Sequence, residues 1–220
     1  MGEIKKAFAT GGIWMYLILG VSILALGVII ERFVFIFFKY NINANAFMGQ
    51  IQKLVMANNI DRAIKLCNAA PNAALPKAIK AGLTRANKGE LEISNAIEEA
   101  TLEIVPIVQK RTPTLGGVAN VATLLGLLGT IWGLIEAFKA VATAPPEMKQ
   151  TLLAGGISIA MYTTAGGLRV AIPTLILHSI VMARTNKIMD DVDQYGLKTV
   201  NLLTARRRGT LKEDAVAEQS

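Results

Sequence analysis

The sequence predicts an all-α integral membrane protein with three transmembrane helices and long cytoplasmic helical extensions. Three uncharged apolar runs, at residues 11–30, 112–135 and 150–168, each reach the roughly 18 residues needed to cross a hydrocarbon core of about 30 Å. The third run continues past one charge to residue 183. Composition points the same way, because 52% hydrophobic residues are too many for an ordinary soluble domain and 18% charged residues are too many for a chain buried wholly in lipid.

These runs divide the chain into successive segments on alternating sides of the membrane. We expect a periplasmic N-terminal segment at 1–11, transmembrane helices at 12–38, 112–138 and 152–183, a cytoplasmic helical loop at 39–111, a periplasmic link at 139–151, and a cytoplasmic C-terminal helix with a disordered tail at 184–220. Lys and Arg number seven near the span ends on the expected cytoplasmic side and four on the other side. Such residues favour the cytoplasm, so the N-terminus is expected outside, although the Lys5 and Lys6 pair argues weakly the other way.

The charge and the reactive residues exclude several classes of function. A net charge of +7 is explained by basic residues that flank membrane spans, so no nucleic-acid partner is expected. Cys67 is the only cysteine and cannot form an internal disulfide. His178 is the only histidine and has no carboxylate beside it. We therefore expect no metal, no cofactor and no enzyme active site.

The first span carries interfacial residues at both ends. Trp14 and Tyr16 stand at its outer end and Tyr40 at its inner end, where amphipathic rings prefer to lie. Glu31 and Arg32 fall in its last third and are expected to face protein or the interface, because a charge facing lipid costs about 2–3 kcal/mol or more. No small-residue cleavage site follows the run, so it is expected to remain as a span.

The cytoplasmic loop has the pattern of amphipathic helices, each with one apolar face. Its last helix carries an acidic cluster, Glu98, Glu99 and Glu103, towards the membrane. This cluster either collects cations at a pore mouth or is a solvated helix face, which is the commoner case. Pro106 and Pro113 are expected to kink or interrupt the helix that leads into the second span.

Two stripes run along the second span when it is drawn as a helix. The first is polar and spans about 80° of the helix circumference, so it must face protein or water; it consists of Thr112, Gly116, Asn120, Thr123 and Thr130. The second is smooth and would let another backbone come close, as membrane helices need when they pack; it consists of Gly126, Gly129 and Gly133.

The link at residues 139–149 is short enough to make the second and third spans an antiparallel hairpin. If the helices meet near Ala137 and Leu152, then Thr130 lies beside Ile159, and Asn120 lies beside Arg169.

On the third span, Ser158, Tyr162 and Arg169 lie within about 40° of one another, whereas Thr163 and Thr164 point elsewhere. Arg169 interrupts a long apolar run and needs a partner, water or the interface. One interpretation is that it snorkels to the cytoplasmic interface, with Asn120 and a carbonyl as partners. The other is that it pairs with a carboxylate of another subunit.

A family resemblance rests on three stretches that together cover most of the chain. GGIWMYLILGVSILALGVIIERF, LLGLLGTIWGLIEAF and GISIAMYTTAGGLRVAIP resemble the three spans of the MotA/TolQ/ExbB membrane motor proteins, specifically the shorter TolQ and ExbB branch. The resemblance implies a bacterial inner-membrane protein that forms a homopentamer around two copies of a single-span partner similar to TolR or ExbD. The partner carries a membrane aspartate, and ion flow is thought to turn the partner helices and do mechanical work on the envelope.

The resemblance also implies roles for individual residues. Thr130 matches the family's hydroxyl-bearing pathway residue on the second span, and Thr164 matches the one on the third. Thr163 and Ser158 are lesser candidates for the ion pathway, and Arg169, Asn120 and Tyr162 are candidates for pore or partner contacts. Ile159 stands where many relatives have a glutamate, and Arg169 stands where an apolar residue is usual.

The expected function is that of an ion-conducting stator subunit, which couples a proton gradient to work such as energised import, protein transport, envelope maintenance or gliding. Because Ile159 cannot carry a proton, two alternatives stay open. One is sodium coupling through the hydroxyls of Thr130, Thr163 and Thr164 with the partner's carboxylate. The other is a non-conducting membrane scaffold that anchors a partner. A secondary transporter is a weaker option, because three spans without an internal repeat give little material for alternating access.

Overall fold

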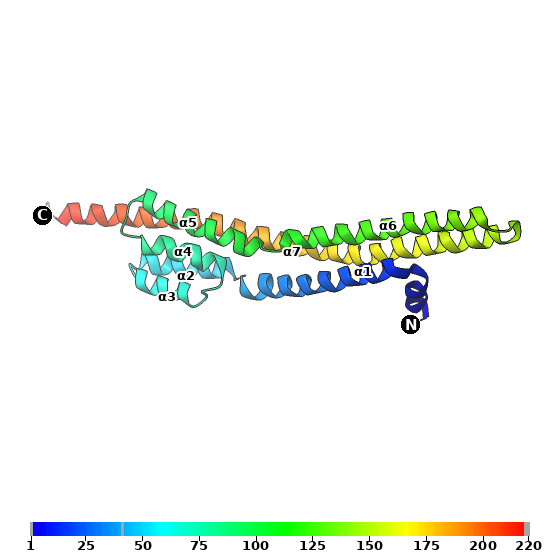
Figure 1. Cartoon of the computed structure of the whole chain (residues 1–220). Coiled ribbons are helices and arrows are strands. Elements are labelled where there is room, and N and C mark those ends of the chain that lie inside the picture. The colour runs from blue at the N-terminus through cyan, green and yellow to red at the C-terminus, as the bar shows by residue number, and fades with distance from the viewer. Residues whose placement is uncertain (1, 41, 218–220) are drawn as a thin grey trace. The chain divides into compact units, whose positions relative to one another are not determined.

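The computed structural model describes residues 2–40 and 42–217, and it describes side chains over 12–37, 40 and 42–209. These residues form helices and no strand, which confirms the predicted all-α class. In chain order, the elements are α1 (Gly2–Val34), the π-helix η1 (Phe35–Lys39), α2 (Ala44–Met56), α3 (Ile60–Asn68), α4 (Ala74–Thr84), α5 (Glu90–Gln109), α6 (Thr112–Thr143) and α7 (Pro146–Ala217), as labelled in Figure 1.

Three helical stretches are long and apolar enough to cross a membrane, as predicted, and they lie within Gly12–Phe37, Glu90–Thr143 and Pro146–Gly209. The membrane boundaries and the sidedness of each segment stay predictions. Of the expected disordered tail, residues 218–220 lie outside the described residues.

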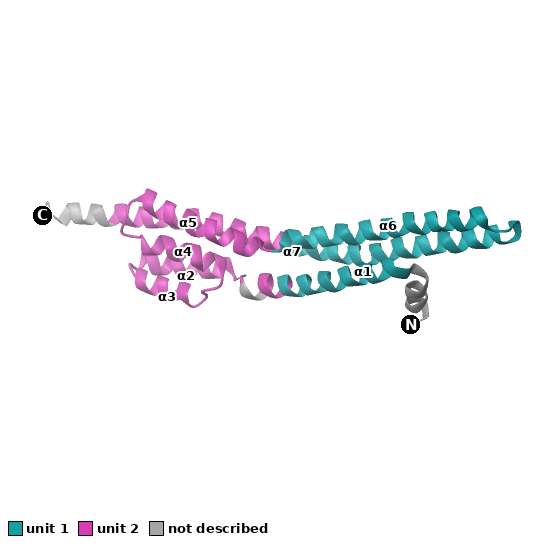
Figure 2. Ribbon diagram, viewed as in Figure 1, with its two compact units in different colours: residues 1–32, 111–181 teal, residues 33–110, 182–220 magenta. Residues whose placement is uncertain are grey.

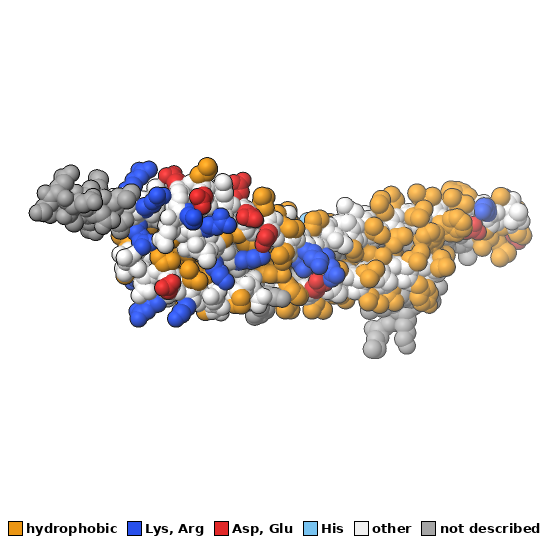
Figure 3. All heavy atoms as spheres, turned by 60° about the vertical axis from the view of Figure 1, so that its left-hand side comes forward, with side chains coloured by type: hydrophobic (Ala, Val, Ile, Leu, Met, Phe, Trp, Pro, Cys, Tyr) orange, Lys and Arg blue, Asp and Glu red, His pale blue; other side chains and the backbone are white. Residues whose placement is uncertain are grey.

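The chain divides into two compact units, coloured separately in Figure 2. Unit 1 comprises residues 1–32 and 111–181, and unit 2 comprises residues 33–110 and 182–220. Hydrophobic side chains cover much of the surface of unit 1, whereas Lys, Arg, Asp and Glu gather on unit 2 (Figure 3). Side chains such as Leu124, Trp132 and Ile172 of unit 1 are more than half exposed. An apolar surface of this extent suits lipid or neighbouring subunits rather than water.

In unit 1, α6 and the first half of α7 form a hairpin that closes at Ala144 and Pro145. Small residues line the buried face of α6, and this lets the two backbones come together. A methyl group built on Gly126 would lie 3.1 Å from the Thr163 carbonyl oxygen, and one on Gly133 would lie 3.3 Å from the Ala160 nitrogen. The predicted smooth stripe is therefore confirmed as the contact face, because no side chain keeps the helices apart.

The register of this hairpin agrees with the expected one to within one helical turn. Thr130 lies beside Ala160, one residue after the expected Ile159, and it also meets Thr164 one turn further along α7. The two helices are longer than expected, because α6 continues to Thr143 and α7 begins at Pro146, but these ends define the same register as Ala137 and Leu152.

Nearly all of helix α1 belongs to unit 1. Gly12 has φ +58° and ψ −147°, a conformation that glycine adopts without strain, and it separates two helical stretches. Beyond it, Met15 and Ile18 pack over Gly166 of α7, and Trp14 meets Trp132 of α6 with ring centroids 6.2 Å apart. These contacts hold α1 against both helices of the hairpin.

Proline has different effects at the two positions where an interruption was expected. Pro106 lies inside α5 without ending it, whereas Pro113 stands in the first turn of α6, where a missing N–H costs nothing. The interruption falls between them, where Arg111 has φ +58°. Its guanidinium is hydrogen-bonded to the carboxylate of Glu31, a contact that stabilises this left-handed residue within unit 1.

Unit 2 contains η1, α2, α3, α4, α5 and the end of α7, and it has a core of its own. The side chains of Ile51, Val55, Ile79, Val108 and Val192 are fully buried. The unit's polar contacts include the Tyr195 hydroxyl with Asn45 and the Lys77 ammonium with Glu103 at 3.3 Å. Glu103 is 62% exposed, which fits the solvated-face interpretation of the acidic cluster.

Cys67 of α3 is 2% exposed, and burial raises the pKa of its thiol to about 11, from 9.0. We expect a maleimide to label it at pH 7.5 at least about tenfold more slowly in the native protein than after denaturation. Equal labelling rates in the two states would contradict the burial of Cys67.

The raised pKa of Cys67 should also make the free energy of unfolding fall as the pH rises from about 9 to 11, because only the unfolded thiol ionises in that range.

Candidate functional site

Two threonine hydroxyls meet across the apolar α6–α7 hairpin. Thr130 of α6 and Thr164 of α7 are hydrogen-bonded to each other through their side chains. The Thr130 hydroxyl also lies 3.1 Å from the Gly126 carbonyl oxygen and 3.0 Å from the Ala160 carbonyl oxygen, while the Thr164 hydroxyl lies 3.4 Å from the former. Both side chains are only partly buried, so the pair borders the surface of unit 1.

The two hydroxyl oxygens have more lone pairs than their hydrogen bonds use. Each hydroxyl has one proton to donate and two lone pairs to accept with. The two hydroxyl protons can form only two of these hydrogen bonds at a time, so oxygen lone pairs remain for a cation. Together with the carbonyls of Gly126 and Ala160, the pair forms a cluster of oxygens inside an otherwise apolar hairpin. Such oxygens suit a hard monovalent cation.

The other two candidates for the ion pathway are placed differently. Thr163 is fully buried, packs against Gly129 and donates a hydrogen bond to the Ala160 carbonyl oxygen at 2.8 Å. This is the local bond that membrane hydroxyls often make. Ser158 is half-buried on α7, and no hydrogen bond between described residues joins it to the pair.

The candidates for pore or partner contacts do not form a cluster. Asn120 and Arg169 are both exposed, and Tyr162 is half-buried. Among the described residues, Arg169 has no hydrogen-bond or ion-pair partner, while its neighbours Leu168 and Ile172 are also exposed. The structure therefore does not support pairing of Arg169 with Asn120, and it presents the guanidinium on an apolar surface.

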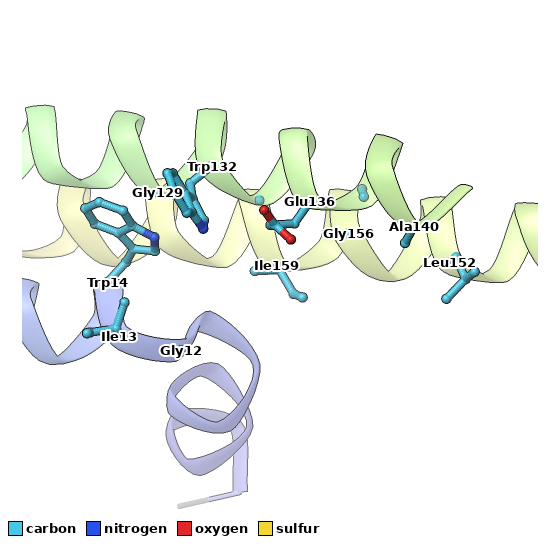
Figure 4. A pocket seen from close by; sticks show the side chains of 12 residues that line it. Gly12, Ile13, Trp14, Gly129, Trp132, Glu136, Ala140, Leu152, Gly156 and Ile159 are labelled. Carbon is cyan, nitrogen blue, oxygen red and sulfur yellow. The ribbon is translucent and has the colours of Figure 1, made fainter. Parts of the chain in front are cut away.

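An unexpected feature of unit 1 is a cavity of about 380 Å³ between α1, α6 and α7. Figure 4 shows Glu136 and Ile159 facing this space from α6 and α7, with Trp14 and Trp132 at its side. The motif GLIEAF contains the signal that could have drawn attention to it, namely a carboxylate directly after an uncharged run. The residues of α1 that complete the cavity are far away in the sequence and have no such signal.

In the described part of the chain, no group of three or more His, Cys, Asp or Glu residues could hold a metal ion. The imidazole of His178 lies over Gly116 instead, 3.4 Å from the position of an added methyl group.

Comparisons with known proteins give a consistent picture. A sequence model of the MotA/TolQ/ExbB proton channel family matches residues 69–194. The putative biopolymer transport protein ExbB-like 3 of Synechocystis sp. is 32% identical over 173 residues, which cover 77% of this chain and 80% of that relative. The Tol-Pal system protein TolQ of Haemophilus influenzae is 34% identical over 124 residues, which cover 56% of this chain and 50% of that relative.

Two further similarities extend this picture. The biopolymer transport protein exbB1 of Vibrio cholerae is 41% identical over 92 residues, which cover 42% of this chain and only 39% of that relative. The solved structure of C. jejuni MotAB superposes with a TM-score of 0.65 at 16% identity, over 93% of this chain and 84% of that chain. At that identity, the likeness concerns the fold alone.

Proposed function

The chain belongs to the MotA/TolQ/ExbB proton channel family, and on that premise we propose that it is the ion-conducting stator subunit of an inner-membrane motor. The family resemblance of the three apolar stretches is thereby confirmed, and with it an energy-coupling role in the membrane. The finer proposal is that ion flow through this subunit drives mechanical work on the cell envelope, such as energised import, protein transport, envelope maintenance or gliding.

The observation that carries this proposal is the contact of Thr130 and Thr164 across the α6–α7 hairpin. This contact places hydroxyl and carbonyl oxygens together inside an apolar hairpin, and such oxygens can line the path of a cation. We propose Thr130 and Thr164 as the pathway hydroxyls. Thr163 is the weaker choice, because its hydroxyl is fully buried and bonded to a carbonyl of its own helix.

We further propose a homopentamer around a single-span partner similar to TolR or ExbD, with the N-terminus of this chain in the periplasm. The wide apolar surface of unit 1 leaves room for such contacts, and the excess of Lys and Arg on one side supports the orientation. The coupling ion is a proton or sodium. Since Ile159 cannot titrate, the partner's aspartate and the hydroxyl pair would then share the ion.

Purification from the native membrane tests this proposal. We expect a single-span protein with a membrane aspartate to accompany the chain in substoichiometric amount. A preparation that reproducibly contains the oligomer without such a protein would contradict the proposal that this chain is a motor subunit.

One observation favours a second candidate, a non-conducting scaffold that anchors a partner. The hydroxyls of Thr130 and Thr164 already lie within reach of helix carbonyls, and hydroxyls of that kind often serve structure alone. The apolar Ile159, which stands where many relatives have a glutamate, fits this candidate too. A scaffold tolerates the loss of a hydroxyl, whereas a conductor does not.

Arg169 provides a separate prediction. The change Arg169→Leu should reduce motor activity by at least about tenfold while the oligomer survives, because the exposed guanidinium pairs with a carboxylate of another subunit. Activity is compared with that of Arg169→Lys, which keeps the charge, and assembly is followed by size-exclusion chromatography. Unchanged activity in Arg169→Leu would remove the pairing.

A further inference from the structure

The proposed pathway through Thr130 and Thr164 gives no role to Glu136, a carboxylate on the same helix as Thr130. It is the only charged residue among those that line the 380 Å³ cavity of unit 1. The other carboxylates in the described part of unit 1 are Glu31, which bonds Arg111, and Glu147, in the first turn of α7. Glu136 is therefore the one acidic side chain in the described part of unit 1 that lines this largely apolar cavity, towards the turn end of the hairpin (Figure 4).

The cavity reaches the level of the hydroxyl pair. Its lining includes Gly129, which precedes Thr130, and Ile159, which precedes Ala160. The Ala160 carbonyl oxygen is the one that lies 3.0 Å from the Thr130 hydroxyl. At the other end, the lining includes Ala140 and Leu152, near the turn of the hairpin. Glu136 lies between these ends, about 9 Å along the helix axis from Thr130 at 1.5 Å per residue.

The electrostatic surroundings of Glu136 are simple. Its carboxylate accepts a hydrogen bond from the Lys139 ammonium at 3.1 Å, and both side chains are more than half exposed. The lining residues from the other two helices bring no charge; they are Gly12, Ile13 and Trp14 of α1 and Leu152, Gly156 and Ile159 of α7.

Trp14 adds a second polar group to the cavity wall. Its indole N–H is buried and has no acceptor among the described residues. A buried donor without an acceptor is rare in folded proteins, so we expect its acceptor to come from a bound water molecule or a neighbouring subunit.

We propose that Glu136 takes up the coupling cation at the turn end of the hairpin and passes it along this cavity to Thr130 and Thr164. The inference rests on the proposed function. The cation is monovalent, either a proton that the carboxylate binds and releases or a sodium ion held by its oxygens. Between transfers, the Lys139 ammonium neutralises the free carboxylate.

Moving the carboxylate across the cavity tests this role. The variants are Glu136→Gln, Glu136→Gln with Ile159→Glu, and the control Glu147→Gln, which makes the same chemical change near the turn. Each is purified with its native partner and reconstituted into liposomes for measurement of cation flux. We expect Glu136→Gln to lose at least tenfold in flux, Glu147→Gln to stay within twofold of the native complex, and the double variant to recover most of the loss.

The outcomes separate this inference from the function on which it rests. If Glu136→Gln keeps its cation flux within twofold of the native complex while Thr130→Val loses its flux, the role of Glu136 is overturned and the proposal of an ion-conducting subunit stands. Native flux in both variants overturns both proposals. Recovery of flux in the double variant excludes misfolding as the cause of the loss, because both carboxylate positions line one cavity. A double variant without flux overturns the proposal that the cation passes along this cavity.

A carbodiimide probe identifies the cation. Dicyclohexylcarbodiimide adds to protonated carboxyl groups in apolar surroundings, and mass spectrometry of the native complex should find the adduct on Glu136 and not on Glu147. Protection by sodium at constant pH assigns a sodium site, whereas labelling that falls with rising pH and ignores sodium assigns a proton site. Labelling of Glu147 with none on Glu136 overturns the proposal.

Discussion

Replacing Thr130 by valine should reduce cation flux through the reconstituted complex by roughly 10- to 150-fold. Valine has nearly the same shape, so the packing of α6 on α7 should survive. The variant loses the oxygen that meets Thr164 and lies 3.0 Å from the Ala160 carbonyl oxygen. A hydrogen bond to a charged group contributes about 1.5–3 kcal/mol, and each 1.4 kcal/mol corresponds to a factor of about ten.

Two matched variants control this experiment. Thr130→Ser keeps the hydroxyl and should retain most of the flux. Thr123→Val removes an exposed hydroxyl of the same helix, which bonds the Ala119 carbonyl oxygen at 3.2 Å, and should be close to native. Native flux in Thr130→Val would contradict a pathway through this hydroxyl and favour the scaffold.

The second large effect concerns the contact between the two backbones of the hairpin. Gly167→Ala should lower the stability of the complex by about 1–3 kcal/mol, the usual cost of overpacking a close contact. The added methyl group would lie 2.6 Å from the Ala122 carbonyl oxygen and 2.9 Å from the Gly126 Cα. Both are backbone atoms of α6, so neither can move aside as a flexible side chain would.

Thermal unfolding of the purified complex, followed by circular dichroism, measures this loss. Gly155→Ala is the control, because a methyl group there meets no atom within 4 Å and alanine favours the helix. We expect the unfolding midpoint to fall in Gly167→Ala and to stay or rise in Gly155→Ala. Equal midpoints in the two variants would mean that the helices are not in contact at Gly167.

Much of this fold was predictable because its signals are local. The length of an apolar run is enough to predict a transmembrane helix, and the spacing of Gly126, Gly129 and Gly133 predicts a contact face from helical geometry. The register was predictable to within one turn, because the short link fixes which residues lie at equal depth. The contacts within that turn depend on how the side chains pack, and they bring Thr130 to the Ala160 carbonyl oxygen and to Thr164.

The remaining features depend on contacts between distant segments. Arg111 adopts a left-handed conformation and bonds Glu31, and the residues around position 111 do not predict this conformation. Glu136 stands directly after an uncharged run, which is a local signal, but its place in a cavity wall depends on Trp14 and the other α1 residues that complete the cavity. The resemblance to the family matched Thr130 and Thr164 to one pathway, but their direct contact required the folded hairpin.

Cation flux through the native complex tests the central claim most directly. The complex is purified with its partner, reconstituted into liposomes, and exposed to an imposed membrane potential in proton-only and in sodium-containing buffers. We predict flux above that of protein-free liposomes in at least one of these buffers, and we predict that Thr130→Val removes it. An intact complex that conducts neither ion would contradict the account and identify the protein as a scaffold.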